Sequence, residues 1–99
     1  MTYQSLRKAL AVFGLGERAT LRQIKARHRQ LVKTHHPDQG DSQDPTMIAK
    51  INTAHEILMD YCENYRFSFS EEEFFEQQPE ERIKRQFGWD PVWSGEKEE

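Results

Sequence analysis

Apolar positions repeat at helical spacing in three stretches of this chain, and residues that end helices or form turns separate them. The first stretch covers residues 3–13, and its apolar face consists of Leu6, Ala9, Leu10 and Phe13. Gly14 and Gly16 follow it, and glycine supplies the backbone freedom that a helix C-terminus requires. The pattern therefore predicts a helix that ends near Phe13.

The second stretch covers residues 20–34 and is amphipathic. Thr20 with Gln23 three residues later has the capping-box pattern of a helix start, and such a cap is worth about 1 kcal/mol. One stripe of this helix is predicted to face inward and consists of Leu21, Ile24, His28 and Leu31. A second stripe is basic and is predicted to face solvent: Arg22, Lys25, Arg29 and Lys33.

The third stretch begins near Pro45, because Asp44 suits the N-cap position and proline suits the first position of a helix. Its predicted inner face consists of Ile48, Ile51, Ala54, His55, Leu58, Tyr61, Cys62 and Tyr65. The residues between the second and third stretches, 35–44, are polar and turn-forming. The predicted fold class is all-α, with the second and third helices packed antiparallel and the first helix laid across them.

The chain changes character after Tyr65. Residues 67–70 alternate Phe and Ser as a short strand does, although no second strand is evident to pair with them. Residues 71–77 are acidic and contain Phe74 and Phe75. Pro79 opens a predicted helix through Gln86, because acidic residues occupy its first turn and a glycine follows its end. We expect residues 66–93 to pack on the first and third helices and residues 94–99 to be disordered.

Composition narrows the class of protein. Ninety-nine residues suit one small domain, and the single cysteine, Cys62, excludes an internal disulfide. No apolar run reaches the length of a membrane span, and the N-terminus lacks a signal pattern, so the cytoplasm is the expected compartment. No catalytic Ser/His/Asp set and no glycine-rich phosphate loop occurs, which predicts that the chain is not an enzyme.

Charge divides the chain into two halves. Residues 1–59 carry nine Lys or Arg and five Asp or Glu, whereas residues 60–99 carry five and twelve. No acidic residue occurs between Arg18 and Lys33. Like charges at helical spacing repel one another, which favours an external acidic surface as the counterpart of the basic stripe.

A short motif, His36-Pro37-Asp38, follows the basic helix directly. Proline cannot continue a helix and restricts the residue before it, so the motif places an imidazole and a carboxylate on a stiffened segment between two helices. Histidines 28, 35, 36 and 55 with Asp38 are the candidate metal ligands. Their spacing lacks a cysteine cluster or a paired-histidine helix, and we therefore expect no metal site. His28 and His55 are expected to be half-buried packing residues.

Several positions around this motif together resemble the J-domain of the DnaJ co-chaperone family. Phe13-Gly14-Leu15 is similar to the family's Leu-Gly-Val turn, and Ala19 through Ile24 is similar to its Ala-x-x-x-x-Ile opening of the next helix. Leu31 lies five residues before the histidine, as the family's core leucine does. In the third helix, Ile51, Ala54 and Leu58 resemble the family's Ile-x-x-Ala-Tyr-x-x-Leu pattern. The resemblance covers roughly residues 5 to 65, and it implies a J-domain at residues 1–65 of the minimal, J-domain-only type.

The resemblance implies a partner and a mode of binding. The family's motif docks on a DnaK-type ATPase chaperone, so the implied partner-binding residues are His36, Pro37 and Asp38 with the basic Arg22, Lys25, Arg27, Arg29 and Lys33. ATP and magnesium would be bound by that partner, and the chain would need no cofactor. The family often has tyrosine where this chain has His28 and a basic residue where it has Gln30, which implies weaker or tuned affinity.

Three alternatives stay open at this stage. The basic residues 20–34 would suit the phosphates of nucleic acid, although the long turns on either side and the acidic C-terminal half argue against that use. A J-like domain that acts only as a scaffold is a second alternative, and the intact motif argues against it. The C-terminal aromatic residues either pack on the helical core or contact a client protein, and packing is favoured because large exposed aromatic patches are rare.

Overall fold

The computed structural model describes residues 1–35 and 45–86. Its elements in chain order are α1 (Tyr3–Phe13), α2 (Leu21–His35), α3 (Pro45–Glu63), α4 (Glu71–Gln77) and α5 (Pro79–Gln86). No strand occurs in the described ranges, and residues 67–69 are irregular. The all-α prediction is confirmed. No helix within residues 1–35 and 45–86 is long and apolar enough to cross a membrane.

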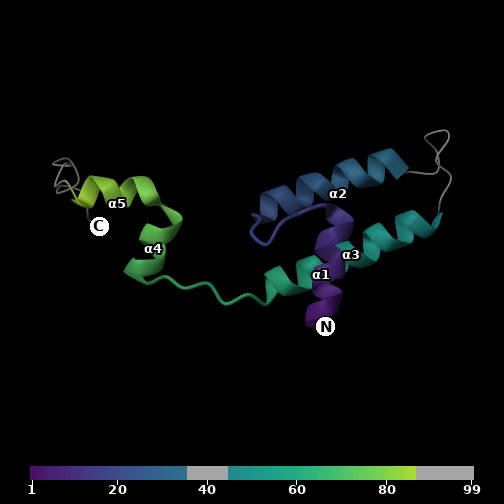
Figure 1. Cartoon of the computed structure of the whole chain (residues 1–99), viewed down its shortest axis with the longest axis horizontal. Helices are drawn as coiled ribbons and strands as arrows, with labels where there is room; N and C mark the ends of the chain where they lie inside the picture. The colour runs from purple at the N-terminus through teal and green to yellow at the C-terminus, as the bar shows by residue number, and fades with distance from the viewer. Residues whose placement is uncertain (36–44, 87–99) are drawn as a thin grey trace. The chain divides into compact units, whose positions relative to one another are not determined.

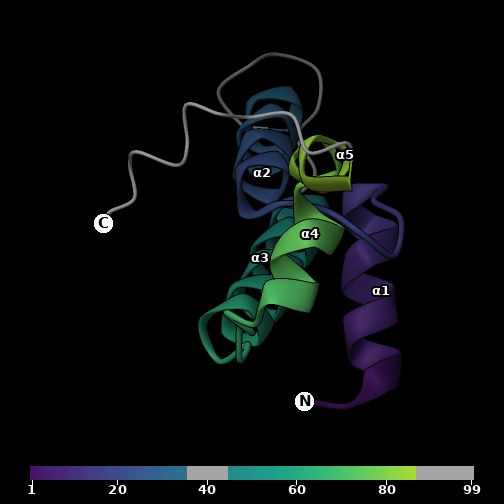
Figure 2. The ribbon, with the colours of Figure 1, turned by 90° about the vertical axis from the view of Figure 1, so that its left-hand side faces the viewer.

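Two compact units make up the chain: Met1–Tyr65 and Arg66–Glu99. In the first unit, α2 and α3 run antiparallel and α1 crosses them (Figures 1 and 2). The second unit contains α4 and α5, which pack against each other. The boundary after Tyr65 coincides with the predicted end of the J-domain. The packing of residues 66–93 on the first unit stays a prediction, and residues 94–99 lie outside the described part.

Local capping explains where α1 and α2 begin. The Thr2 hydroxyl accepts a hydrogen bond from the Ser5 amide at 3.0 Å, and the Ser5 hydroxyl oxygen accepts one from the Thr2 amide at 3.0 Å. At α2, the Thr20 amide donates to the Gln23 side chain at 2.8 Å, and the Gln23 amide donates back to the Thr20 hydroxyl at 3.1 Å. Each box satisfies amides that lack a partner within the helix. The predicted cap at Thr20 is confirmed.

Gly14 ends α1 in the left-handed conformation, with φ of 67°. Its amide donates to the Ala11 carbonyl at 3.1 Å, and the Leu15 amide donates to the Leu10 carbonyl at 3.0 Å. These two bonds form a Schellman motif, which requires a residue that tolerates positive φ. Gly16 does not have a positive φ. Gly14 alone therefore ends α1, although the sequence pattern predicted this role for both glycines.

The core of the first unit lies where the three helices meet. Its buried residues are Ala9, Phe13, Ile24, Ile51, Ala54 and Leu58. Phe13 and Ile51 are fully buried, and Leu31, Ile48 and Cys62 are half-buried against this cluster. Most positions of the predicted inner stripes are therefore confirmed.

Three predicted inward positions are wrong. Leu21, Tyr61 and Tyr65 are 44%, 46% and 53% exposed. A helix buries only those turns that another helix covers, and Leu21 lies on the first turn of α2, whereas Tyr65 lies beyond the end of α3. The two tyrosine rings instead pack edge to face, 5.7 Å apart.

The α4 helix was not predicted from sequence. Ser70 is its N-cap and accepts a hydrogen bond from the Glu73 amide at 3.1 Å, and three glutamates occupy its first turn. Both features favour a helix start because they complement the free amides and the helix dipole. The signal was present in the sequence, but the short length of the helix hid its periodicity. The predicted helix from Pro79 to Gln86 is confirmed as α5.

Candidate partner-binding site

Four basic side chains form one exposed face of α2: Arg22, Lys25, Arg29 and Lys33. They lie three or four residues apart, and this spacing stacks them along one side of a helix. No ion pair joins any of them to a residue within 1–35 or 45–86. We call these four residues the basic face. The predicted solvent exposure of this stripe is confirmed.

Arg27, the fifth basic residue assigned to partner binding, is placed differently. Its Nε donates a hydrogen bond to the Phe13 carbonyl at 2.8 Å, and its Nη1 donates to the Gln30 side chain at 3.1 Å. The Phe13 carbonyl stands at the end of α1, where the helix itself provides no donor. The half-buried guanidinium thus joins α1 to α2. This bond pairs residues fourteen positions apart, and no sequence pattern indicated it.

Gln30 stands where the family often has a basic residue, and in this structure it forms a hydrogen bond within α2. Its side-chain oxygen accepts a hydrogen bond from Arg27 and holds the guanidinium in position. A basic side chain at this position would provide no acceptor for that contact. The substitution therefore exchanges a surface charge for an intramolecular hydrogen bond.

Beneath the basic face, His28 of α2 and His55 of α3 pack ring against ring and lie near the buried Phe13 ring. Burial and the neighbouring His28 lower the pKa of His55, and Lys25 acts in the same direction, whereas Glu56 opposes them. The expectation that both histidines are half-buried packing residues is confirmed. No three His, Cys, Asp or Glu side chains of the described ranges are grouped as metal ligands would be.

His36, Pro37 and Asp38 lie outside the described residues. The basic face lies on a helix whose last residue, His35, immediately precedes them in the chain. The roles assigned to the three motif residues and to the basic residues remain predictions.

An antiparallel helical pair with a crossing first helix, a basic face and an adjoining His-Pro-Asp sequence defines the J-domain class of helical protein. The family profile described as DnaJ domain matches residues 8–66. This match covers more than half of the chain, and the chain therefore belongs to the DnaJ domain family.

One curated relative is the Chaperone protein DnaJ of Ureaplasma parvum serovar 3, which is 45% identical over 49 residues. The aligned part amounts to 50% of this chain and 13% of that relative. The chain thus spans a small part of the relative it matches. No solved structure matches the chain.

Proposed function

We propose that this protein is a co-chaperone that binds a DnaK-type chaperone and stimulates its ATP hydrolysis. The observation that carries the proposal is the exposed basic face of α2, whose helix immediately precedes His36-Pro37-Asp38 in a chain of the DnaJ domain family. ATP and magnesium are bound by the partner, and this chain contributes no catalytic group of its own.

In the proposed mechanism, the basic face and the His36-Pro37-Asp38 motif have different roles. The cations of the basic face attract an acidic surface of the partner and accelerate the encounter. Asp38 then offers a carboxylate to a partner arginine, a charge-assisted and geometrically specific pairing. Pro37 restricts the backbone, so less conformational entropy is lost on docking.

Docking stimulates hydrolysis by changing the populations of the partner's conformations. A ligand shifts a conformational equilibrium only as far as it binds one state more tightly than the other. We propose that this domain binds the hydrolysis-competent arrangement of the DnaK-type chaperone more tightly than its other arrangements. The acceleration then requires no group of this chain at the reacting phosphate.

A single-turnover ATPase assay of a DnaK-type chaperone, with and without the full-length chain, tests the proposal. We expect faster hydrolysis with wild-type protein and a weaker effect at low concentration for Arg29→Ala. Arg7→Ala is the matched control, because Arg7 is an exposed arginine on α1, whereas the basic face belongs to α2. An unchanged hydrolysis rate with folded wild-type protein would contradict the proposal. Salt-sensitive binding to duplex DNA in its place would favour the nucleic-acid alternative.

A further inference from the structure

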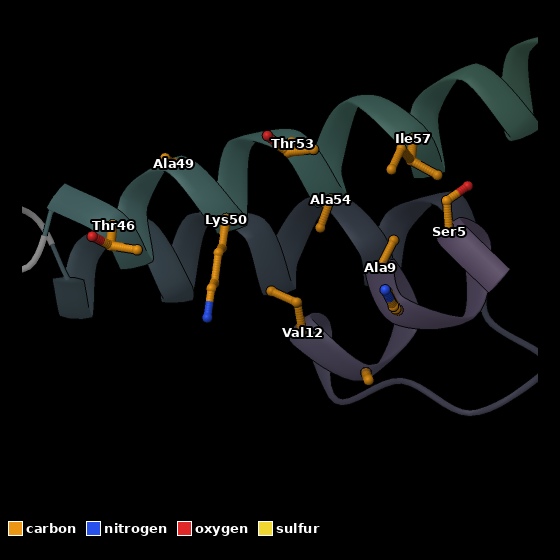
Figure 3. Close-up of a pocket in the computed structure, with 11 residues that line it drawn as sticks. Ser5, Ala9, Val12, Thr46, Ala49, Lys50, Thr53, Ala54 and Ile57 are labelled. Carbon is orange, nitrogen blue, oxygen red and sulfur yellow. The ribbon is translucent and has the colours of Figure 1, made fainter. Parts of the chain in front are cut away.

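α1 and α3 border an apolar groove of about 700 Å³ in the first unit. Buried Ala9 of α1 and Ala54 of α3 form its floor. Figure 3 shows Ala9 and Val12 pointing from α1 toward α3, and Ala54 pointing from α3 toward α1. Helices that cross at an angle diverge on either side of the crossing, and short side chains do not fill the space between them. The crossing of α1 over α3 therefore creates the groove.

The groove is elongated along α3. Its lining residues on this helix run from Thr46 to Ile57, a distance of about 17 Å along the axis, or about three turns. Val12 and Ile57 are half-buried in its walls, so part of their apolar surface is not covered by the described residues. A groove of this length and polarity fits the apolar face of another helix, whose anchoring side chains recur every three or four residues.

The charge around the groove has one sign. Lys8 of α1 and Lys50 of α3 are exposed and line it. No acidic residue occurs in α1, and none of the three acidic residues of α3 lines the groove. Cations on both sides of an apolar floor favour an occupant that is acidic at its edges and disfavour a basic one.

The acidic helix of this chain, α4, does not have free carboxylates to offer. Three of its four glutamates are bound by side chains of the second unit: Glu71 by Arg85, Glu73 by Gln77 and Glu76 by Arg82. Pairing these glutamates with the groove lysines would break contacts that already exist. A second copy of the chain presents the same bound glutamates. The charge of the groove therefore favours an acidic segment of a different protein.

We propose that the groove between α1 and α3 binds an acidic amphipathic helix of a second protein, with bulky apolar side chains in the groove and carboxylates facing Lys8 and Lys50. The groove belongs to α1 and α3, whereas the basic face belongs to α2. The two surfaces thus bind different partners, and the proposal does not depend on the co-chaperone function.

Titration of the isotope-labelled full-length chain with a designed helical peptide, followed by NMR, tests this proposal. The peptide is about four turns long and carries leucines every three or four residues on one face, with glutamates flanking them. A matched peptide keeps the leucines and replaces every glutamate by lysine. We expect the acidic peptide to shift the signals of Val12, Ala49 and Ile57 and to bind several-fold more tightly than the lysine peptide.

Charge reversal separates the groove from the net charge of the chain. Lys8→Glu with Lys50→Glu is expected to weaken binding of the acidic peptide and to strengthen binding of the lysine peptide. Arg7→Glu with Arg18→Glu changes the net charge equally, at exposed residues that do not line the groove. This control variant is expected to keep the preference of wild type for the acidic peptide.

Filling the groove tests the apolar part of the contact. Ala49→Trp places a large ring at an exposed position that lines the groove, and it is expected to abolish peptide binding without lowering the melting temperature. Asn52→Trp is the matched control, because Asn52 is an exposed residue of α3 that does not line the groove. We expect this control to bind the acidic peptide as wild type does.

Four results would overturn the proposal. The first is an absence of shifts at the groove in the folded full-length chain, which is also the result expected if residues 66–93 fill the groove. The second is equal affinity for the acidic and lysine peptides. The third is a set of shifts confined to the basic face, which would assign the peptide to α2. The fourth is a concentration-dependent shift of Val12 and Ala49 without peptide, which would assign the groove to a second copy.

Discussion

The imidazole rings of His28 and His55 lie 3.8 Å apart, centroid to centroid, and within 11° of parallel, at the contact between α2 and α3. Phe13 of α1 extends this arrangement, with its ring near parallel to both and 6.2 and 6.4 Å away. The Nε2 atom of His28 is buried and has no hydrogen-bond partner among the described residues. The stack joins all three helices of the first unit through ring contacts, so a positive charge on the His55 ring would weaken it.

Acidification is therefore expected to destabilise the first unit. The pKa of His55 is lowered from its ordinary value of 6.5, chiefly by burial and next by His28. The folded state thus favours neutral imidazole, and this contribution to stability is complete above pH 6.5 and is lost as the pH falls from 6.5 toward the lower folded pKa. Chemical unfolding at a series of pH values checks the direction.

His55→Phe supplies the control for this pH dependence. Phenylalanine keeps an aromatic ring in the stack but does not titrate. We expect its unfolding free energy to vary less than that of wild type just below pH 6.5, the ordinary pKa. Equal pH dependence of the two proteins would show that the histidine stack does not carry the effect.

Arg27 is expected to stabilise the fold more than its exposed neighbours do. Arg27→Ala removes the donor to the Phe13 carbonyl and leaves a partly buried acceptor without it, a loss of about 1–3 kcal/mol. Arg29→Ala removes a solvated side chain and should change the unfolding free energy by less than about 0.5 kcal/mol. Urea denaturation of both variants makes the comparison. Similar losses would contradict the structural role of Arg27.

Substitutions on the two faces of α2 are expected to separate effects on packing from effects on partner binding. Ile24 is 4% exposed, and Ile24→Ala should cost about 2–5 kcal/mol as a buried large-to-small change. Leu31 is only half-buried, so Leu31→Ala should cost about 2 kcal/mol, at the lower end of that range. Lys33→Ala should instead leave the melting temperature unchanged and slow association with a DnaK-type chaperone in a salt-dependent way. A large stability loss in Lys33→Ala would mean that the face is assigned wrongly.

The motif residues give the sharpest test of the proposed function. His36→Gln and Asp38→Asn should each abolish stimulation of the partner's ATPase, because each removes a group, the imidazole or the carboxylate, that the partner is proposed to bind. Far-UV circular dichroism and the melting temperature serve as controls and should match wild type, since each substitution replaces one polar side chain by another of similar size. Full stimulation by either variant would contradict the proposed mode of binding.

Truncation after Tyr65 should lower the melting temperature and retain ATPase stimulation. The first unit keeps its buried core and its basic face, while the burial predicted for residues 66–93 is lost. Small domains depend strongly on added apolar burial, which is why the loss should be measurable. Differential scanning calorimetry of the full-length and truncated chains checks the stability. An unchanged melting temperature would argue that residues 66–99 do not contribute to it.

The sequence by itself determined the helices that have strong local signals. The bounds of α1 and α5, the cap at Thr20 and the helix start at Pro45 agree with prediction, because caps, proline and apolar spacing act within a few residues. The DnaJ domain family was also readable from sequence, since its motifs occur at matching spacing. The short α4 helix was missed, although its cap at Ser70 is equally local.

Only the tertiary structure decided which side chains meet across helices. The bond from Arg27 to the Phe13 carbonyl, the His28–His55 stack and the groove beside Ala54 each depend on how far apart the helices lie and at what angle they cross. The exposure of Leu21 and Tyr61 has the same origin, because helical spacing predicts a face but not the length over which another helix covers it.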